Sequence, residues 1–92
     1  MALENSQVAL VQNVPAKIAT TGFGDPVLLV NNGTGVIYIG KDNTVSTANG
    51  FRVDVAPNAT SRLELTDFEG EVWAMTADVA GANVCVLQGK AG

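Results

Sequence analysis

The segment Phe51-Arg52-Val53-Asp54-Val55 decides the fold class of this chain. Its apolar residues alternate with charged ones. Successive side chains of an extended strand point to opposite faces, so the alternation places the apolar side chains on one face and the charged side chains on the other. The segment is therefore predicted to be a half-buried β-strand.

The same alternation returns in Arg62-Leu63-Glu64-Leu65, after a turn predicted at Ala56-Pro57-Asn58-Ala59. Further runs rich in β-branched and aromatic residues recur between turn signals spaced roughly eight to twelve residues apart. No segment has the period expected of a long amphipathic helix. The sequence predicts an all-β fold, a small β-sandwich or jelly-roll-like barrel of about eight short antiparallel strands.

Two apolar runs, Val27-Leu28-Leu29-Val30-Asn31 and Val36-Ile37-Tyr38-Ile39-Gly40, are predicted to form a hairpin. The intervening Asn32-Gly33-Thr34-Gly35 contains residues that adopt the positive φ of a tight reversal. Both faces of each strand are apolar. Such strands are expected at the centre of a structure, or with one face in the core and the other against a partner subunit.

A single β domain is predicted for residues 8–88, between a flexible N-terminal arm of residues 1–7 and a flexible C-terminal tail of residues 89–92. The domain begins with Val8-Ala9-Leu10-Val11, for which a short helix capped by Asn5 is the alternative. Because this strand is apolar and follows a polar arm, it could add to a neighbouring sheet edge and attach the protein to a partner. The predicted core consists of Val30, Ile37, Ile39, Val53, Val55, Leu63, Leu65, Val72 and Val86.

Composition and charge exclude several classes of protein. The 92 residues, of which 47% are hydrophobic and 15% charged, fit one folded domain rather than a disordered chain or a two-domain enzyme. The net charge of -4, with five scattered basic residues, disfavours nucleic-acid binding, which needs clustered lysine and arginine. The apolar runs are too short for a membrane helix.

Candidate chemistry is sparse. With no histidine in the chain, the Ser–His and Cys–His pairings of nucleophilic catalysis are missing, and Cys85 is predicted to be a buried thiol. Asp67, Glu69 and Glu71 could attract a hard cation, but a solvated acidic loop is the favoured interpretation. We therefore predict no catalytic residue, no metal site and no cofactor.

The two largest side chains with polar tips are Tyr38 and Trp73. Aromatic faces can stack on sugars, so the pair could form a carbohydrate platform. Each lies among apolar neighbours within a predicted strand, which favours packing in the core or at a subunit interface instead.

The order of motifs resembles a known group of proteins. Residues 36–40 read VIYIG, residues 43–51 read NTVSTANGF, and residues 71–76 and 84–87 read EVWAMT and VCVL. In this order the chain is similar to the small all-β virion proteins of tailed bacteriophages, over roughly residues 27–87. In that group the usual roles are capsid decoration (cement), head fibre and other structural attachment.

The resemblance implies a non-enzymatic capsid decoration protein that binds the outside of the assembled head and stabilises it. It implies the major capsid protein as partner, a homo-oligomer, with a trimer expected from capsid geometry, and a place on the outer capsid surface after synthesis in the host cytoplasm. Neither nucleic acid nor membrane is an expected partner. The alternative is a carbohydrate- or receptor-binding module of a head or tail fibre. The predicted partner contacts are Val8, Leu10, Val11, Tyr38 and Trp73.

Overall fold

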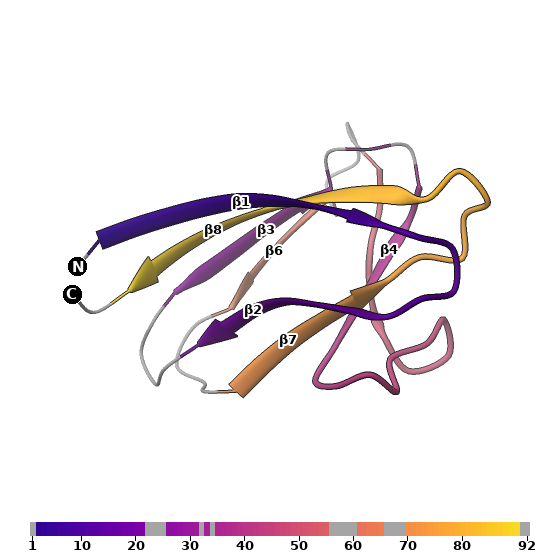
Figure 1. The fold of residues 1–92 in the computed structure, drawn as a ribbon, viewed down its shortest axis with the longest axis horizontal. Helices are drawn as coiled ribbons and strands as arrows, with labels where there is room; N and C mark the ends of the chain where they lie inside the picture. The colour runs from indigo at the N-terminus through magenta and orange to yellow at the C-terminus, as the bar shows by residue number, and fades with distance from the viewer. Residues whose placement is uncertain are drawn as a thin grey trace.

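The computed structural model is an all-β sandwich (Figure 1) and describes residues 2–21, 26–31, 33, 35–55, 61–65 and 70–90. These residues form no helix that is long and apolar enough to cross a membrane. The strands are β1 (Ala2–Leu10), β2 (Ala16–Thr21), β3 (Val27–Asn31), β4 (Ile37–Gly40), β5 (Phe51–Val53), β6 (Arg62–Leu65), β7 (Gly70–Met75) and β8 (Ala82–Lys90).

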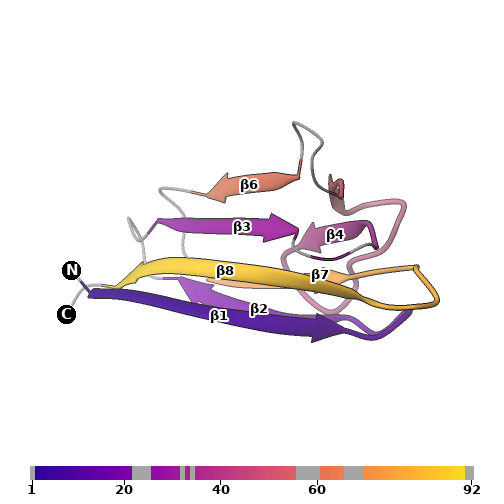
Figure 2. The same ribbon diagram turned by 90° about the horizontal axis from the view of Figure 1, so that it is seen from above.

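The strands form two four-stranded sheets, in the orders β1-β8-β3-β6 and β2-β7-β4-β5. All named strand pairs are antiparallel, and four of them are nested, β1 with β8, β2 with β7, β3 with β6 and β4 with β5. A long antiparallel ribbon folded over on itself in this way is a jelly roll. The prediction of a small all-β sandwich is confirmed. Figure 2 shows the order β1, β8, β3, β6 across one sheet and the start of β1 beside the end of β8.

The predicted hairpin between residues 27–31 and 36–40 is wrong. Strand β3 pairs with β6 and β8, whereas β4 pairs with β5 and β7, so the chain crosses from one sheet to the other between them. Neither Gly33 nor Gly35 has a positive φ. Gly35 is required for close approach instead, because a Cβ there would lie 2.5 Å from the carbonyl oxygen of Gly81.

One apolar layer lies between the two sheets. Of the predicted core residues, Ile37, Ile39, Val53, Val72 and Val86 are buried in it, and Leu63 and Leu65 pack against it half-buried. The apolar layer also contains buried residues outside the predicted core set, namely Leu10, Ile18, Ala19, Val27, Leu29, Ala74, Ala82 and Val84.

Two core predictions are wrong. In β3 the buried positions are Val27, Leu29 and Asn31, so the side chain of Val30 lies on the outer face, half-buried. The prediction was shifted by one residue because a strand that is apolar on both faces carries no local signal for which face is inside. Val55 lies beyond the end of β5 and is also only half-buried.

The predicted arm and tail belong to the sheet as far as the structure describes them. Strand β1 starts at Ala2 and pairs with β8 over its whole length, from Ala2 opposite Lys90 to Leu10 opposite Ala82. Polar residues are tolerated at this position because β1 is an edge strand, and its residues Glu4 to Gln7 are exposed on both faces of the strand. The domain therefore extends beyond the predicted limits of residues 8 and 88.

Asn31 is a buried polar residue that ties the two sheets together. Its Nδ2 donates to the carbonyl oxygens of Gly35 at 2.8 Å and Val53 at 3.1 Å, and its Oδ1 accepts from the backbone N–H of Gly33 at 3.1 Å. Val53 lies in β5 of the opposite sheet. The side chain thus satisfies backbone groups at the point where the chain crosses between the sheets.

Two other buried polar residues donate to backbone carbonyl oxygens. Gln88 in β8 donates from Nε2 to the carbonyl oxygen of Thr20 in β2, at 2.7 Å, and so joins the two sheets at the end near the termini. Thr76 donates from its hydroxyl to the carbonyl oxygen of Val36 at 2.8 Å. No buried side-chain nitrogen or oxygen of the described residues lacks a hydrogen-bond partner.

We predict that N31A lowers the free energy of unfolding by about 2–4 kcal/mol, because it leaves buried backbone groups unpaired. Urea denaturation monitored by Trp73 fluorescence measures this. The matched control is N43A, at an exposed position, which is expected to change stability by less than about 0.5 kcal/mol. Equal effects of the two substitutions would contradict the bridging role of Asn31.

We further predict that deletion of residues 1–7 destabilises the fold by roughly 2–4 kcal/mol, since it removes most of the β1–β8 ladder and bares the edge of β8. The same denaturation experiment tests this, with deletion of residues 91–92 as the control for shortening the chain. A flexible arm would instead leave the midpoint of unfolding unchanged.

Candidate partner-binding surfaces

The described residues hold no group of three or more histidine, cysteine or acidic side chains that could bind a metal ion. Of the acidic residues considered for a cation, Asp67 and Glu69 lie outside the described residues. Glu71 is engaged elsewhere: its Oε1 accepts from Nε1 of Trp73 at 2.9 Å, and its Oε2 lies 3.7 Å from Nζ of Lys17. The surfaces that remain as candidates for function are apolar and aromatic.

The predicted contacts Val8 and Leu10 lie on the inward face of β1. Leu10 is buried in the core, and Val8 packs half-buried against it. They pair with Ala82 and Val84 of β8, whose side chains also point inward, and cross-strand partners share a face. Leu10 is therefore enclosed between the sheets, and Val8 remains a predicted partner contact with only part of its side chain exposed.

Val11 is exposed, as a partner contact needs to be, and two further exposed valines lie in the same pair of loops. Val11 is 65% exposed and Val14 53% in the loop between β1 and β2, and Val79 is 85% exposed in the loop between β7 and β8. We call these three valines the apolar tip. Figure 1 shows the two loops together at the end of the sandwich away from the termini.

Hydrogen bonds hold the two loops of the apolar tip against each other. The backbone N–H of Asn13 donates to the carbonyl oxygen of Thr76 at 2.7 Å, and Nε2 of Gln12 donates to that of Ala77 at 3.2 Å. Asn13 has a φ of 60°, which asparagine tolerates better than most residues. The valines are therefore presented on a fixed backbone.

The turn that carries Val79 is fixed as well. The backbone N–H of Gly81 donates to the carbonyl oxygen of Asp78 at 2.9 Å, and Oδ1 of Asp78 accepts from the N–H of Ala80 at 2.8 Å. Gly81 has a φ of 81°, and a Cβ there would lie 2.5 Å from the carbonyl oxygen of Leu10. Sequence analysis did not select Val14 or Val79. Each could have been recognised in the sequence only as a single valine within a predicted turn.

Tyr38 and Trp73 share the outer face of the β2-β7-β4-β5 sheet, and both are half-buried there rather than in the core. Tyr38 lies opposite Met75 and Trp73 opposite Gly40, so the two aromatic residues are diagonal neighbours on adjacent strands. On the far side of β7, Trp73 pairs with Lys17. We call Tyr38 and Trp73 the aromatic face.

Charged residues and a structured loop border the aromatic face. Arg52 lies opposite Tyr38 and donates from Nε to Oδ1 of Asp54, which raises the pKa of Arg52. In the loop after β4, the Thr44 hydroxyl and backbone N–H donate to Asp42 and lower the pKa of that carboxyl group. The Arg52–Asp54 pair therefore places opposite charges beside Tyr38, and the Thr44–Asp42 bonds order the loop that follows β4.

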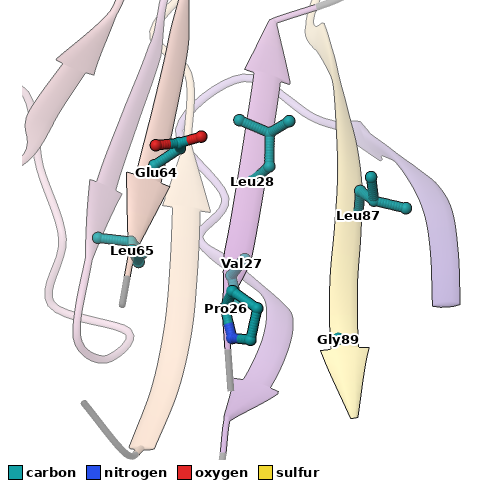
Figure 3. A pocket seen from close by; sticks show the side chains of 7 residues that line it. All are labelled: Pro26, Val27, Leu28, Glu64, Leu65, Leu87 and Gly89. Atoms are coloured by element: carbon teal, nitrogen blue, oxygen red, sulfur yellow. The ribbon is translucent and has the colours of Figure 1, made fainter. Parts of the chain in front are cut away.

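The outer face of the other sheet carries an apolar centre that sequence analysis did not assign to a site. Leu28, Val30 and Cys85 are half-buried there and Leu87 is 41% exposed. Cys85 is therefore not the fully buried thiol that was predicted. Figure 3 shows Leu28 and Leu87 side by side on β3 and β8, beside a hollow of about 190 Å³.

No protein-family model, curated protein or solved structure matches this chain.

Proposed function

We propose that this chain is a non-enzymatic structural protein of a bacteriophage virion, a decoration or cement protein that binds the outside of the assembled head. Its partner is the major capsid protein. The observation that supports the proposal best is the apolar tip, in which Val11, Val14 and Val79 project from two hydrogen-bonded loops.

Exposed valines gathered at one end of a small domain mark a contact surface, because single exposed apolar residues are normally scattered. The loops that carry them are fixed by the Asn13–Thr76 and Gln12–Ala77 hydrogen bonds, so binding costs little ordering of the backbone. A lattice-binding protein needs such a rigid, apolar attachment point and no reactive group.

Fold, charge and sequence resemblance support the same proposal. Jelly rolls recur in viral capsid proteins and in lectins, although a fold alone does not define a function. The net charge of -4 suits a protein on the outside of a particle, away from packaged DNA. The likeness to small phage virion proteins over roughly residues 27–87 adds the class of particle.

We predict that V11S and V79S each weaken binding to purified phage heads about tenfold, since burying a valine side chain is worth about 1.5 kcal/mol. Co-sedimentation of labelled protein with heads depleted of it gives the affinity, and electron microscopy of the same particles shows the occupied positions.

The matched control is F51S, which removes an apolar side chain of 73% exposure outside the tip. It is expected to bind as the unsubstituted protein does. Full binding by the V11S/V79S double variant would exclude the apolar tip as the attachment site, and no binding of the unsubstituted protein to any head would exclude the decoration function.

A carbohydrate-binding module of a fibre is the second candidate function, favoured by the aromatic face. Tyr38 and Trp73 lie on one outer face, Trp73 is oriented by its hydrogen bond to Glu71, and Lys17 and Arg52 supply donors beside them. Stacking on aromatic rings with polar groups at the border is the usual way in which proteins bind sugars.

Under this second function, titration with bacterial cell-wall polysaccharide fragments is expected to shift or quench the fluorescence of Trp73, the single tryptophan of the chain. W73F lacks this fluorophore and is measured by titration calorimetry; it is expected to bind more weakly, because the smaller ring offers less stacking area. The tip variant V11S serves as control and retains sugar binding. Trp73 fluorescence that stays unchanged across a panel of host polysaccharides would exclude the aromatic face as a sugar site.

A further inference from the structure

Two rows of side chains cross the outer face of the β1-β8-β3-β6 sheet. The strand registers align Glu64, Leu28, Leu87 and Asn5 in the first row. They align Arg62, Val30, Cys85 and Gln7 in the second row. We call these two rows the paired rows.

Each of the paired rows has an apolar centre with a polar residue at either end. The centre is formed by β3 and β8, where Leu28, Val30 and Cys85 are half-buried and Leu87 is exposed. One end carries the charged residues of β6 and the other carries the amides of β1. Figure 3 shows Glu64, Leu28 and Leu87 in line across three strands.

The charges at the β6 end are opposite and adjacent. Arg62 and Glu64 are exposed, they lie two positions apart on one face, and within the described residues neither takes part in an ion pair. The ion pairs among the described residues, Lys17–Glu71 and Arg52–Asp54, lie on or next to strands of the opposite sheet. The paired rows are therefore complementary in charge to a copy of themselves.

We propose that the paired rows form a two-fold symmetric interface with a second copy of this chain. The two-fold axis runs across the strands, midway between the rows, so that each row faces the other row of the second copy. Arg62 then faces Glu64 of the second copy, and Leu28 faces its Val30. Leu87 faces its Cys85.

The charges select this axis. A two-fold axis along the strands, between β3 and β8, would instead place Arg62 opposite Gln7 and Glu64 opposite Asn5 of the second copy, and would leave both charges without a counter-charge. In the proposed arrangement the apolar centre supplies the buried area, while the two Arg62–Glu64 pairs at the border fix the register. Facing sheets pack with their strands nearly aligned at about 10 Å, which this axis allows.

The interface leaves the apolar tip free, since the tip lies on loops at one end of the sandwich and not on the sheet face (Figure 1). The axis reverses the strand direction of the second copy, so the two tips of a dimer point to opposite ends. If the proposed function holds, such a dimer could bridge two neighbouring capsomers. The dimer itself does not depend on that function, and it takes the place of the trimer expected from the resemblance.

Charge reversal tests the interface with purified protein and no particle. The unsubstituted chain is expected to show twice its 9.5 kDa mass in sedimentation equilibrium. R62E and E64R each place like charges opposite one another and are expected to raise the dissociation constant of the dimer about tenfold or more. The double variant R62E/E64R restores the opposite pairing and is expected to return within about threefold of the original value.

The matched control is K41E, which makes the same charge change as R62E at an exposed position outside the paired rows and is expected to leave the dissociation constant unchanged. Circular dichroism of each variant verifies the fold. A chain that remains monomeric up to submillimolar concentration, or a double variant that dissociates as readily as R62E, would overturn the proposal.

Discussion

The single apolar layer between the two sheets is the constraint on which the rest of this structure depends. A chain of 92 residues has room for one such layer, so every strand has to send alternate side chains into it. The nested pairing of β1 with β8, β2 with β7, β3 with β6 and β4 with β5 achieves this by rolling one long ribbon around the layer. Every residue between two inward positions is thereby placed on an outer face, where it is available to a partner.

Buried polar side chains connect the two sheets, which share no strand pairing with each other. Asn31 joins the crossing from β3 to β4 with β5, and Gln88 joins β8 with β2, in each case by a hydrogen bond to a backbone carbonyl of the other sheet. A buried amide costs free energy unless all its groups are paired. These residues therefore specify one relative position of the two sheets, which the apolar contacts alone fix less strictly.

The three candidate surfaces of the molecule differ in the elements that form them. The apolar tip is made by loops and sits at one end, whereas the aromatic face and the paired rows are made by strands and lie on opposite sheets. Because the loops of the tip are hydrogen-bonded to each other through Asn13 and Thr76, attachment there would not disturb either sheet face. Attachment to a particle and pairing with a second copy are thus compatible in one small domain.

The sequence by itself determined the fold class, because the alternation that marks a strand is local, as in Arg62–Leu65. In Phe51-Arg52-Val53-Asp54-Val55 it identified a strand, but only Val53 is buried and Phe51 is 73% exposed. It also identified β3 as apolar on both faces, and it selected Val11. It could not tell that Leu29 points inward and Val30 outward, that β3 and β4 belong to different sheets, or that Ala2–Gln7 pairs with β8. Val79 and the paired rows were missed for the same reason. In a jelly roll the partners are far apart in the chain, as Leu28 is from Leu87, so that strand pairing, and with it the choice of inner and outer face, was decided only by the tertiary structure.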